Sequence, residues 1–483
     1  GKCIVVDSAT TVDTRSVDLR TDAIDLQGTI TGDGDSDGSA TVRTFTGDRI
    51  INFGTGSGGL DLAGNTFSSA GKIQGFKKNI VGDAAKKSNI KAGGVTADNK
   101  LVLSSAAGKI TVSGAVTVAA GHGLTLASKD SVEGAGVIPA DAVNLDATDA
   151  VVRLTGTHAI QKLDGKAKEL AFKNSADLVV GGETGLTIGA GGANIAVTAG
   201  DLTVGVHGLK NGAGALALKA SGTLSMDAGA EVASTGAADT SLEAGAVAVG
   251  TGAKIKTTGG KINVKTDALT LPSGEQGVLS SANGTVTVET KSAGKTMSVN
   301  GGTADIQMTD LGFINSGTGA VQIGNASTGS IKIGTTSVDA PLTVTSGATV
   351  SVTGAVTNPN NKDVTFKGNT VDFTAGSSLA AGSGTTTIVA DNVRLDNGSF
   401  TGTGIFRVQK KTAGGFTVGG ASTFVSDAGL GKLIGGFYNV EIGAKDYVGT
   451  ATINTISTGK LPAYTSILTK GALSVTGTVN GGA

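Results

Sequence analysis

The chain has no tryptophan, few aromatic or charged residues and a single cysteine. Aromatic side chains make up 3% and charged side chains 16% of its 483 residues, and the formal net charge is -1. Conventional globular cores take much of their buried area from aromatic rings, so their scarcity argues against such a core. The near balance of charges gives no strong field that would recruit nucleic acid or anionic lipid. We therefore expect no nucleic-acid partner.

Disulfides and long apolar runs are also missing. The lone Cys3 cannot form an internal disulfide, and the near-absence of cysteine fits many exported bacterial proteins. A start at Gly1 without Met has two explanations, trimming after export or a residue left by an expression tag. No run of 18 apolar residues is present, so we expect no transmembrane segment. These features together favour an extracellular or cell-surface location.

Glycine and short apolar units are abundant instead. Glycine fills 79 positions, yet 39% of the chain is hydrophobic and its mean hydropathy is +0.15, which excludes ordinary disorder. A recurring unit of apolar, polar and apolar residues is followed by a glycine-rich turn, as in Leu202-Thr203-Val204. Alternation with period two places both apolar side chains on one face of a strand. The units therefore predict many short strands around a narrow aliphatic interior.

The spacing of these units favours a β-solenoid over a β-sandwich. Val321 and Leu342 begin units 21 positions apart, and so do Val350 and Val371. About 20 residues with three short strands are typical of one coil of a parallel β-helix. We therefore predict an all-β fold, a parallel β-helix (β-solenoid) with about 20 residues per coil and roughly 15 to 22 coils. The prolines flank the units, as a ladder of backbone hydrogen bonds requires.

The aromatic residues gather towards both ends of the chain. Four phenylalanines lie within residues 45–76 and ten aromatic residues within 366–464. One reading is chance with a few wider coils; the other is specialised ends, because an open solenoid end presents unpaired strand edges. We predict an N-terminal β region or cap at 1–76, a solenoid body at 77–400 and a distinct C-terminal β region or cap at 401–483. Within the first region, residues 1–30 are candidates for a strand that pairs with a neighbouring subunit.

The repeat style resembles one known family. The segment "GLTIGAGGANIAVTAGDLTVG" and its neighbours, over residues 100–400, resemble the repeats of filamentous-haemagglutinin-like exoproteins and other bacterial β-solenoid surface proteins. The resemblance implies a right-handed parallel β-helix and an extracellular, elongated, structural or adhesive protein of the two-partner-secretion type. That family carries an NPNG-type turn in its secretion domain. Here Asn358-Pro359-Asn360 is followed by Asn361 in place of glycine.

One acidic motif has the spacing of metal ligands. In Asp33-Gly34-Asp35-Ser36-Asp37-Gly38, alternate carboxylates can converge on one hard cation while glycine permits a sharp turn, as in the first half of a calcium loop. An EF-hand has a bidentate Glu at its twelfth position, where this chain has Thr44. Asp33, Asp35 and Asp37 are therefore a candidate calcium site, with a flexible acidic surface loop as the alternative. No other cofactor is expected.

No motif in the chain indicates catalysis. His122, His158 and His207 are isolated from one another, and we expect each to be a loop residue. The leading hypothesis is a bacterial extracellular structural protein that self-assembles into a filament, sheath or surface layer, end to end or laterally. The alternatives are a monomeric adhesin shaft that binds host or cell-surface glycans or proteins, and a carbohydrate-active β-helix enzyme.

Overall fold

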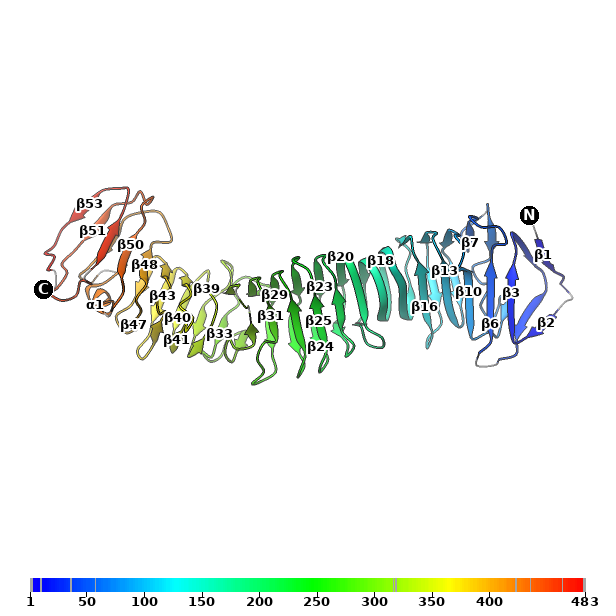
Figure 1. The fold of residues 1–483 in the computed structure, drawn as a ribbon, viewed down its shortest axis with the longest axis horizontal. Coiled ribbons are helices and arrows are strands. Elements are labelled where there is room, and N and C mark those ends of the chain that lie inside the picture. The colour runs from blue at the N-terminus through cyan, green and yellow to red at the C-terminus, as the bar shows by residue number, and fades with distance from the viewer. Residues whose placement is uncertain are drawn as a thin grey trace. The chain divides into compact units, whose positions relative to one another are not determined.

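The chain folds as an all-β solenoid of parallel stacked strands. The computed structural model describes residues 3–8, 11–34, 37–56, 58–315, 317, 319–421, 424–434, 436–462 and 464–480. It has about 21 turns of roughly 22 residues and almost no helix, which confirms the predicted fold with slightly longer coils than expected. Contacts divide the chain into unit 1 (1–243 and 249–254) and unit 2 (244–248 and 255–483). Figure 1 draws each unit as a stack of short strands. The predicted boundaries at residues 76 and 400 stay predictions.

Unit 1 begins with three separate parallel ladders. They join β1 (Cys3–Val6) to β4 (Ala23–Leu26), β2 (Thr11–Thr14) to β5 (Thr29–Gly32), and β3 (Ser16–Arg20) to β6 (Ser39–Arg43). The segment at 1–30, predicted to offer a strand to a neighbouring subunit, thus uses at least one edge of each described strand inside its own chain. The other edge of β1 has no ladder partner among the described residues.

Successive coils of unit 1 then add strands to one ladder in register. The strands that follow one another on this face are β6, β10 (Lys78–Asp83), β13 (Lys100–Ser105), β16 (Gly123–Ser128) and β18 (Pro139–Asn174). Alternate apolar residues align from coil to coil, so that Val81, Leu103, Leu126 and Leu145 lie in one row. All four are at most 1% exposed. The interior is therefore a column of stacked aliphatic side chains, as the alternation predicts.

Strand β18 is longer than the sequence pattern predicts. It runs for 36 residues, where the pattern predicts strands of about three residues separated by glycine turns. Within 139–174 only Gly156 and Gly165 are glycines, so extended backbone continues round the corners of the coil. The long strand β20 (Leu186–Val197) pairs with it, with a register shift between Ala167 and Glu169.

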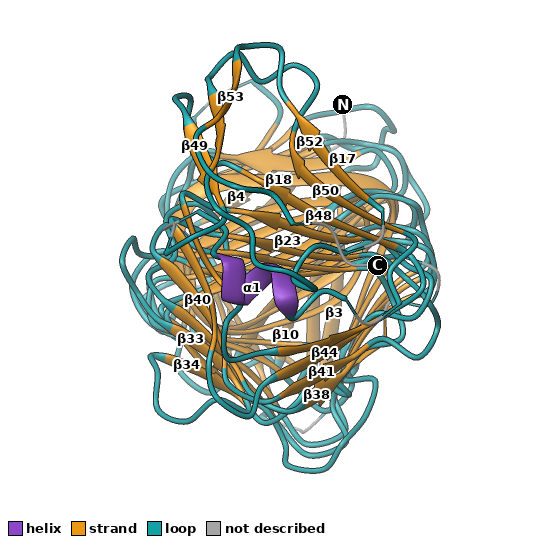
Figure 2. Cartoon of the chain, turned by 90° about the vertical axis from the view of Figure 1, so that its left-hand side faces the viewer, coloured by secondary structure: helices purple, strands orange, loops and turns teal. Residues whose placement is uncertain are grey.

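Three ladders of short strands form the middle coils of unit 2. The first contains β36 (Val321–Ile323), β39 (Leu342–Thr345), β42 (Val364–Lys367), β45 (Thr386–Val389) and β48 (Ile405–Gln409); the second contains β37 (Ile331–Ile333), β40 (Thr349–Val352), β43 (Thr370–Phe373) and β46 (Asn392–Arg394); the third contains β38 (Thr336–Ser337), β41 (Ala355–Thr357), β44 (Ser378–Ala380) and β47 (Ser399–Thr401). In the end-on view of Figure 2, β48, β40 and β44 mark three different sides of the coil. The predicted units at 342–344 and 350–352 lie in β39 and β40.

The interior of unit 2 holds a row of phenylalanines. Phe366, Phe373, Phe400 and Phe406 are at most 3% exposed. Their ring centroids follow one another at 5.8, 4.7 and 5.4 Å in edge-to-face arrangements. These four of the aromatic residues that gather towards the end of the sequence are therefore core residues of consecutive coils.

One short helix lies next to the end of the second ladder of unit 2. Helix α1 (Asp427–Gly431) begins at Ser426, whose hydroxyl accepts a hydrogen bond from the Gly429 N–H at 2.9 Å. The Ser426 hydroxyl also donates to Asp396, two residues after β46, and Leu430 is fully buried. Figure 2 shows α1, in purple, near the middle of the view.

Two ladders continue through the last part of unit 2. Their strands are β49 (Phe416–Val418), β51 (Ala451–Ile453) and β53 (Leu473–Val475) in one ladder, and β48, β50 (Asn439–Gly443) and β52 (Thr465–Leu468) in the other. Within the described chain no helix has the length and apolar character that a bilayer crossing needs.

The Asn-Pro-Asn turn shows why asparagine can stand where the family pattern has glycine. Asn361 has a φ of 55°, in the left-handed region that glycine and asparagine tolerate best. Its side-chain oxygen accepts a hydrogen bond from the Ser383 N–H of the next coil at 3.0 Å. Asn358 is 2% exposed and donates to the Ala340 carbonyl at 3.0 Å. The turn is therefore a coil corner of unit 2.

Candidate functional site

The predicted calcium motif lies in the loop between β5 and β6. Asp33 and Asp37 are exposed, and Asp35 lies outside the described residues. Asp37 forms an ion pair with Arg15 at 3.4 Å. Among the residues that the structure describes, no three His, Cys, Asp or Glu side chains gather as a metal site would require. A site made of Asp33, Asp35 and Asp37 needs the carboxylate of Asp35, so it stays a prediction.

The expectation that His158 is a loop residue was wrong. It lies inside β18 with 0% exposure, and its ring stacks on Phe172 with centroids 4.8 Å apart. Its Nδ1 accepts a hydrogen bond from the Ile138 N–H at 3.1 Å. Its Nε2 is buried and has no hydrogen-bond partner among the described residues. Burial lowers the pKa of His158, and the Leu154 carbonyl opposes part of that shift. Its position two residues before the inward-facing Ile160 is the sequence signal that would have placed it in the core.

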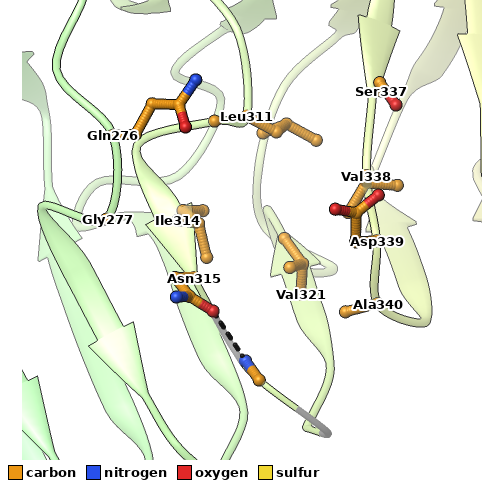
Figure 3. Close-up of a pocket in the computed structure, with 12 residues that line it drawn as sticks. Gln276, Gly277, Leu311, Ile314, Asn315, Val321, Ser337, Val338, Asp339 and Ala340 are labelled. Carbon is orange, nitrogen blue, oxygen red and sulfur yellow. Dashed lines mark hydrogen bonds between the residues drawn. The ribbon is translucent and has the colours of Figure 1, made fainter.

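One hollow of unit 2, shown in Figure 3, lies beside β35 (Ile314–Asn315). It has a volume of about 370 Å³, and Ile314 and Val321 contribute apolar walls. Asp339, its one charged lining residue, stands on the wall opposite Asn315. The Asn315 side chain accepts a hydrogen bond from the Gly317 N–H at 3.0 Å. The hollow therefore offers hydrogen bonds to a small polar molecule but no concentration of charge.

A larger hollow runs over one sheet face of unit 1. Two adjoining cavities of about 540 and 380 Å³ share Lys100, Thr125 and Asn144. These three residues come from β13, β16 and β18, which are successive strands of one ladder. The two cavities are thus parts of one groove that crosses several coils, here named the unit 1 groove.

Small residues open the unit 1 groove. The outward-facing position between Leu126 and Ser128 is Ala127, and Gly165 lies further along the floor. Gly165 has a φ of 109°, and a Cβ there would lie 2.0 Å from the Leu145 carbonyl oxygen. Only glycine fits this close approach of two coils, so the groove floor depends on it.

The charges along the unit 1 groove are unevenly distributed. The smaller cavity is balanced, because Lys100 and Lys162 line it together with Asp141 and Glu183. Lys162 forms an ion pair with Glu183 at 2.6 Å, and that hydrogen-bonded carboxylate raises the pKa of Lys162. His122, in a turn, also lines this cavity. The larger cavity has a positive excess, since three lysines and one aspartate line it; they are Lys78, Lys100, Lys166 and Asp146.

Exposed apolar side chains gather in the outermost coils. In unit 2, Tyr438 is 73% and Tyr464 is 69% exposed, with ring centroids 6.4 Å apart, and Val475 on β53 is 58% exposed. In unit 1, Val5 on β1 is also 58% exposed. Strand β53 pairs with β51 along one edge, and its other edge has no ladder partner in the described part of the chain. Each of these two edges thus combines unpaired backbone groups with exposed apolar side chains.

Comparison with known proteins adds no family to this description. No protein-family model, curated protein or solved structure matches the chain. The resemblance to filamentous-haemagglutinin-like exoproteins is therefore one of repeat style, consistent with the β-solenoid but without support at the level of the family. The class that the structure defines is a β-solenoid repeat protein.

Proposed function

We propose that the chain is a bacterial extracellular structural protein that associates with copies of itself into a filament, sheath or surface layer. The β-solenoid fold is compatible with a structural or adhesin-like role. The observation that supports self-association is a pair of strand edges, on β1 and β53, that have no ladder partner among the described residues and that each present an exposed valine. The proposed role is structural, with no catalysis.

The physical reason lies in what an open parallel edge exposes. Backbone N–H and C=O groups on an edge strand are a template for another strand. Pairing β53 of one copy with β1 of a second copy continues a parallel ladder and removes Val5 and Val475 from water. Full burial of a valine contributes roughly 1.5–3 kcal/mol. Because the two edges differ, the contact is heterologous and permits open growth.

Assembly is tested by sedimentation velocity and negative-stain microscopy of the purified chain over a range of concentrations. We expect polymers that grow with concentration. Val475→Lys places a charge on the β53 edge and is expected to leave monomers. Val206→Lys is the matched control, since Val206 is a 55% exposed valine in a turn of unit 1, and it is expected to polymerise normally. A wild-type chain that stays monomeric at every concentration, with or without calcium, contradicts the proposal.

A monomeric adhesin shaft is the second candidate, and the unit 1 groove favours it. A polar hollow that crosses several coils gives a rigid face on which an extended ligand can lie. A binding screen of the monomeric Val475→Lys variant against glycans and matrix proteins separates this role from self-association. Release of reducing sugar from a bound polysaccharide would instead favour a carbohydrate-active enzyme.

A further inference from the structure

The larger cavity of the unit 1 groove has a positive excess, with three lysines and one aspartate among its described lining residues. Lys78 on β10 and Lys100 on β13 stand opposite each other in register. Like charges directly opposite each other on paired strands destabilise a sheet. Within the described chain, neither lysine forms an ion pair, in contrast to Lys162 in the neighbouring cavity. Folding alone gives no reason for this arrangement, whereas binding of an anion does.

A third lysine extends the positive surface along the groove. Lys166 lines the same cavity from β18 and likewise forms no ion pair among the described residues. Leu145 and Gly165 contact each other on successive coils, so Lys166 lies about three coils beyond Lys100. At about 4.8 Å per coil, the two lysines are separated by roughly 14 Å along the groove. An elongated anion of that length can therefore contact Lys100 at one end and Lys166 at the other.

Uncharged polar groups line the floor between these lysines. Ser104, Thr125 and Asn144 contribute hydroxyl and amide groups to the larger cavity. Such groups both donate and accept hydrogen bonds, as the hydroxyls of a sugar chain require. Among the described residues, no Phe, Tyr or Trp lines either cavity and His122 is the one ring, so the groove has no row of aromatic side chains on which successive nucleic-acid bases could stack. Its length, charge and hydrogen-bonding groups match a sugar chain with acidic substituents.

We propose that the unit 1 groove binds a linear acidic polysaccharide. Lys78, Lys100 and Lys166 contact its carboxylate or sulfate groups, and Thr125 and Asn144 contact its hydroxyls. Asp146, the one acidic residue in the larger cavity, opposes binding. The inference does not depend on self-association, because every residue of the groove lies in unit 1 and away from the β1 edge.

Binding is measured by biolayer interferometry with the full chain and four immobilised probes. Polygalacturonate presents carboxylates, heparin presents sulfates, dextran is neutral, and single-stranded DNA presents phosphates with bases. We expect binding to one or both acidic polysaccharides that weakens as salt is raised, and no binding to dextran. The preferred acidic probe distinguishes carboxylate from sulfate recognition. Absence of binding to both acidic polysaccharides, equal binding to dextran, or tighter binding to DNA overturns the inference.

Three variants separate the groove from general surface charge. Lys100→Gln is expected to weaken binding by about three- to tenfold, the range for one charge-assisted contact at a partly exposed site. Lys91→Gln removes an exposed lysine of unit 1 that does not line the groove, and it is expected to bind like the wild type. Asp146→Asn is expected to strengthen binding, a gain that a folding defect cannot produce. Equal losses in Lys91→Gln and Lys100→Gln, or weaker binding by Asp146→Asn, contradict the assignment.

Discussion

Truncating Phe373 tests whether the coils of unit 2 share one packed interior. The side chain is 0% exposed. Its ring lies between Phe366, with centroids 5.8 Å apart at 90°, and Phe400, with centroids 4.7 Å apart at 68°. Phe373→Ala therefore removes a buried aromatic ring together with both edge-to-face contacts.

The expected loss follows from burial and from the rigidity of the column. Replacement of a buried phenylalanine by alanine costs about 3–5 kcal/mol, and the value rises when the surroundings cannot collapse into the cavity. Here the coil spacing is held by backbone ladders, since β43 pairs with both β40 and β46. Aromatic pairs contribute about 0.5–1.5 kcal/mol each beyond their buried area, and the range for such replacements already includes them. Because Phe373 has two such pairs, we expect the free energy of unfolding to fall by an amount in the upper part of that range, roughly 4–5 kcal/mol.

Denaturant unfolding followed by circular dichroism measures this loss, and amide hydrogen exchange locates it. Because each coil of a repeat protein contacts its neighbours, protection should fall in β40, β43 and β46 while unit 1 stays protected. Phe45→Ala is the control, as Phe45 is 41% exposed and its truncation should change stability by under about 1 kcal/mol. A loss below about 1 kcal/mol for Phe373→Ala, or faster exchange in unit 1 alone, would refute the packing described here.

Two further variants test unit 1. Gly165→Ala places a Cβ 2.0 Å from the Leu145 carbonyl oxygen at a φ of 109°. We expect a lower melting temperature and a free energy of unfolding that falls by roughly 2 kcal/mol or more. Gly47 has open space around it, so the control Gly47→Ala should melt like the wild type. For His158, the folded-state pKa lies below 6.5, so the unfolded chain takes up a proton first as the pH falls. The free energy of unfolding should then decrease below pH 6.5 by up to about 1.4 kcal/mol per pH unit, and His158→Gln should flatten this slope between pH 7 and 5.5 in denaturant titrations. Parallel slopes for the two chains would contradict the buried neutral imidazole.

The fold could be predicted from the sequence because each coil repeats one alternation of inward-facing apolar and outward-facing polar residues. Leu202 and Val204 face the interior and Thr203 faces outwards. Because this alternation recurs about every 20 residues, the coil can be recognised from local sequence alone. The 36-residue β18 could not be predicted in the same way. Its corners contain few glycines, and their extended conformation depends on pairing with the coils on either side.

The unit 1 groove could not be predicted, because it depends on register. Lys78, Lys100 and Lys166 are distant in sequence and share no motif, and only the ladder of β10, β13, β16 and β18 brings them to one face. The apolar pattern leaves the alignment of neighbouring coils open by several residues. The calcium motif is the opposite case: it is evident in the sequence, but a test of it needs Asp35, which lies outside the described residues.

Engineered cysteine pairs test the winding of the chain most directly. Thr343 and Thr365 are half-buried partners on β39 and β42, and Thr365 is in turn the partner of Thr387 on β45. Partners on adjacent coils have Cα atoms about 4.8 Å apart, within the roughly 4.4–6.8 Å that a disulfide spans, while two coils separate Thr343 from Thr387 by about 9.6 Å. With Cys3→Ser as background, mild oxidation and mass spectrometry should find a disulfide in Thr343→Cys/Thr365→Cys and free thiols in Thr343→Cys/Thr387→Cys. Free thiols in the first pair, or a disulfide in the second, would contradict the in-register solenoid.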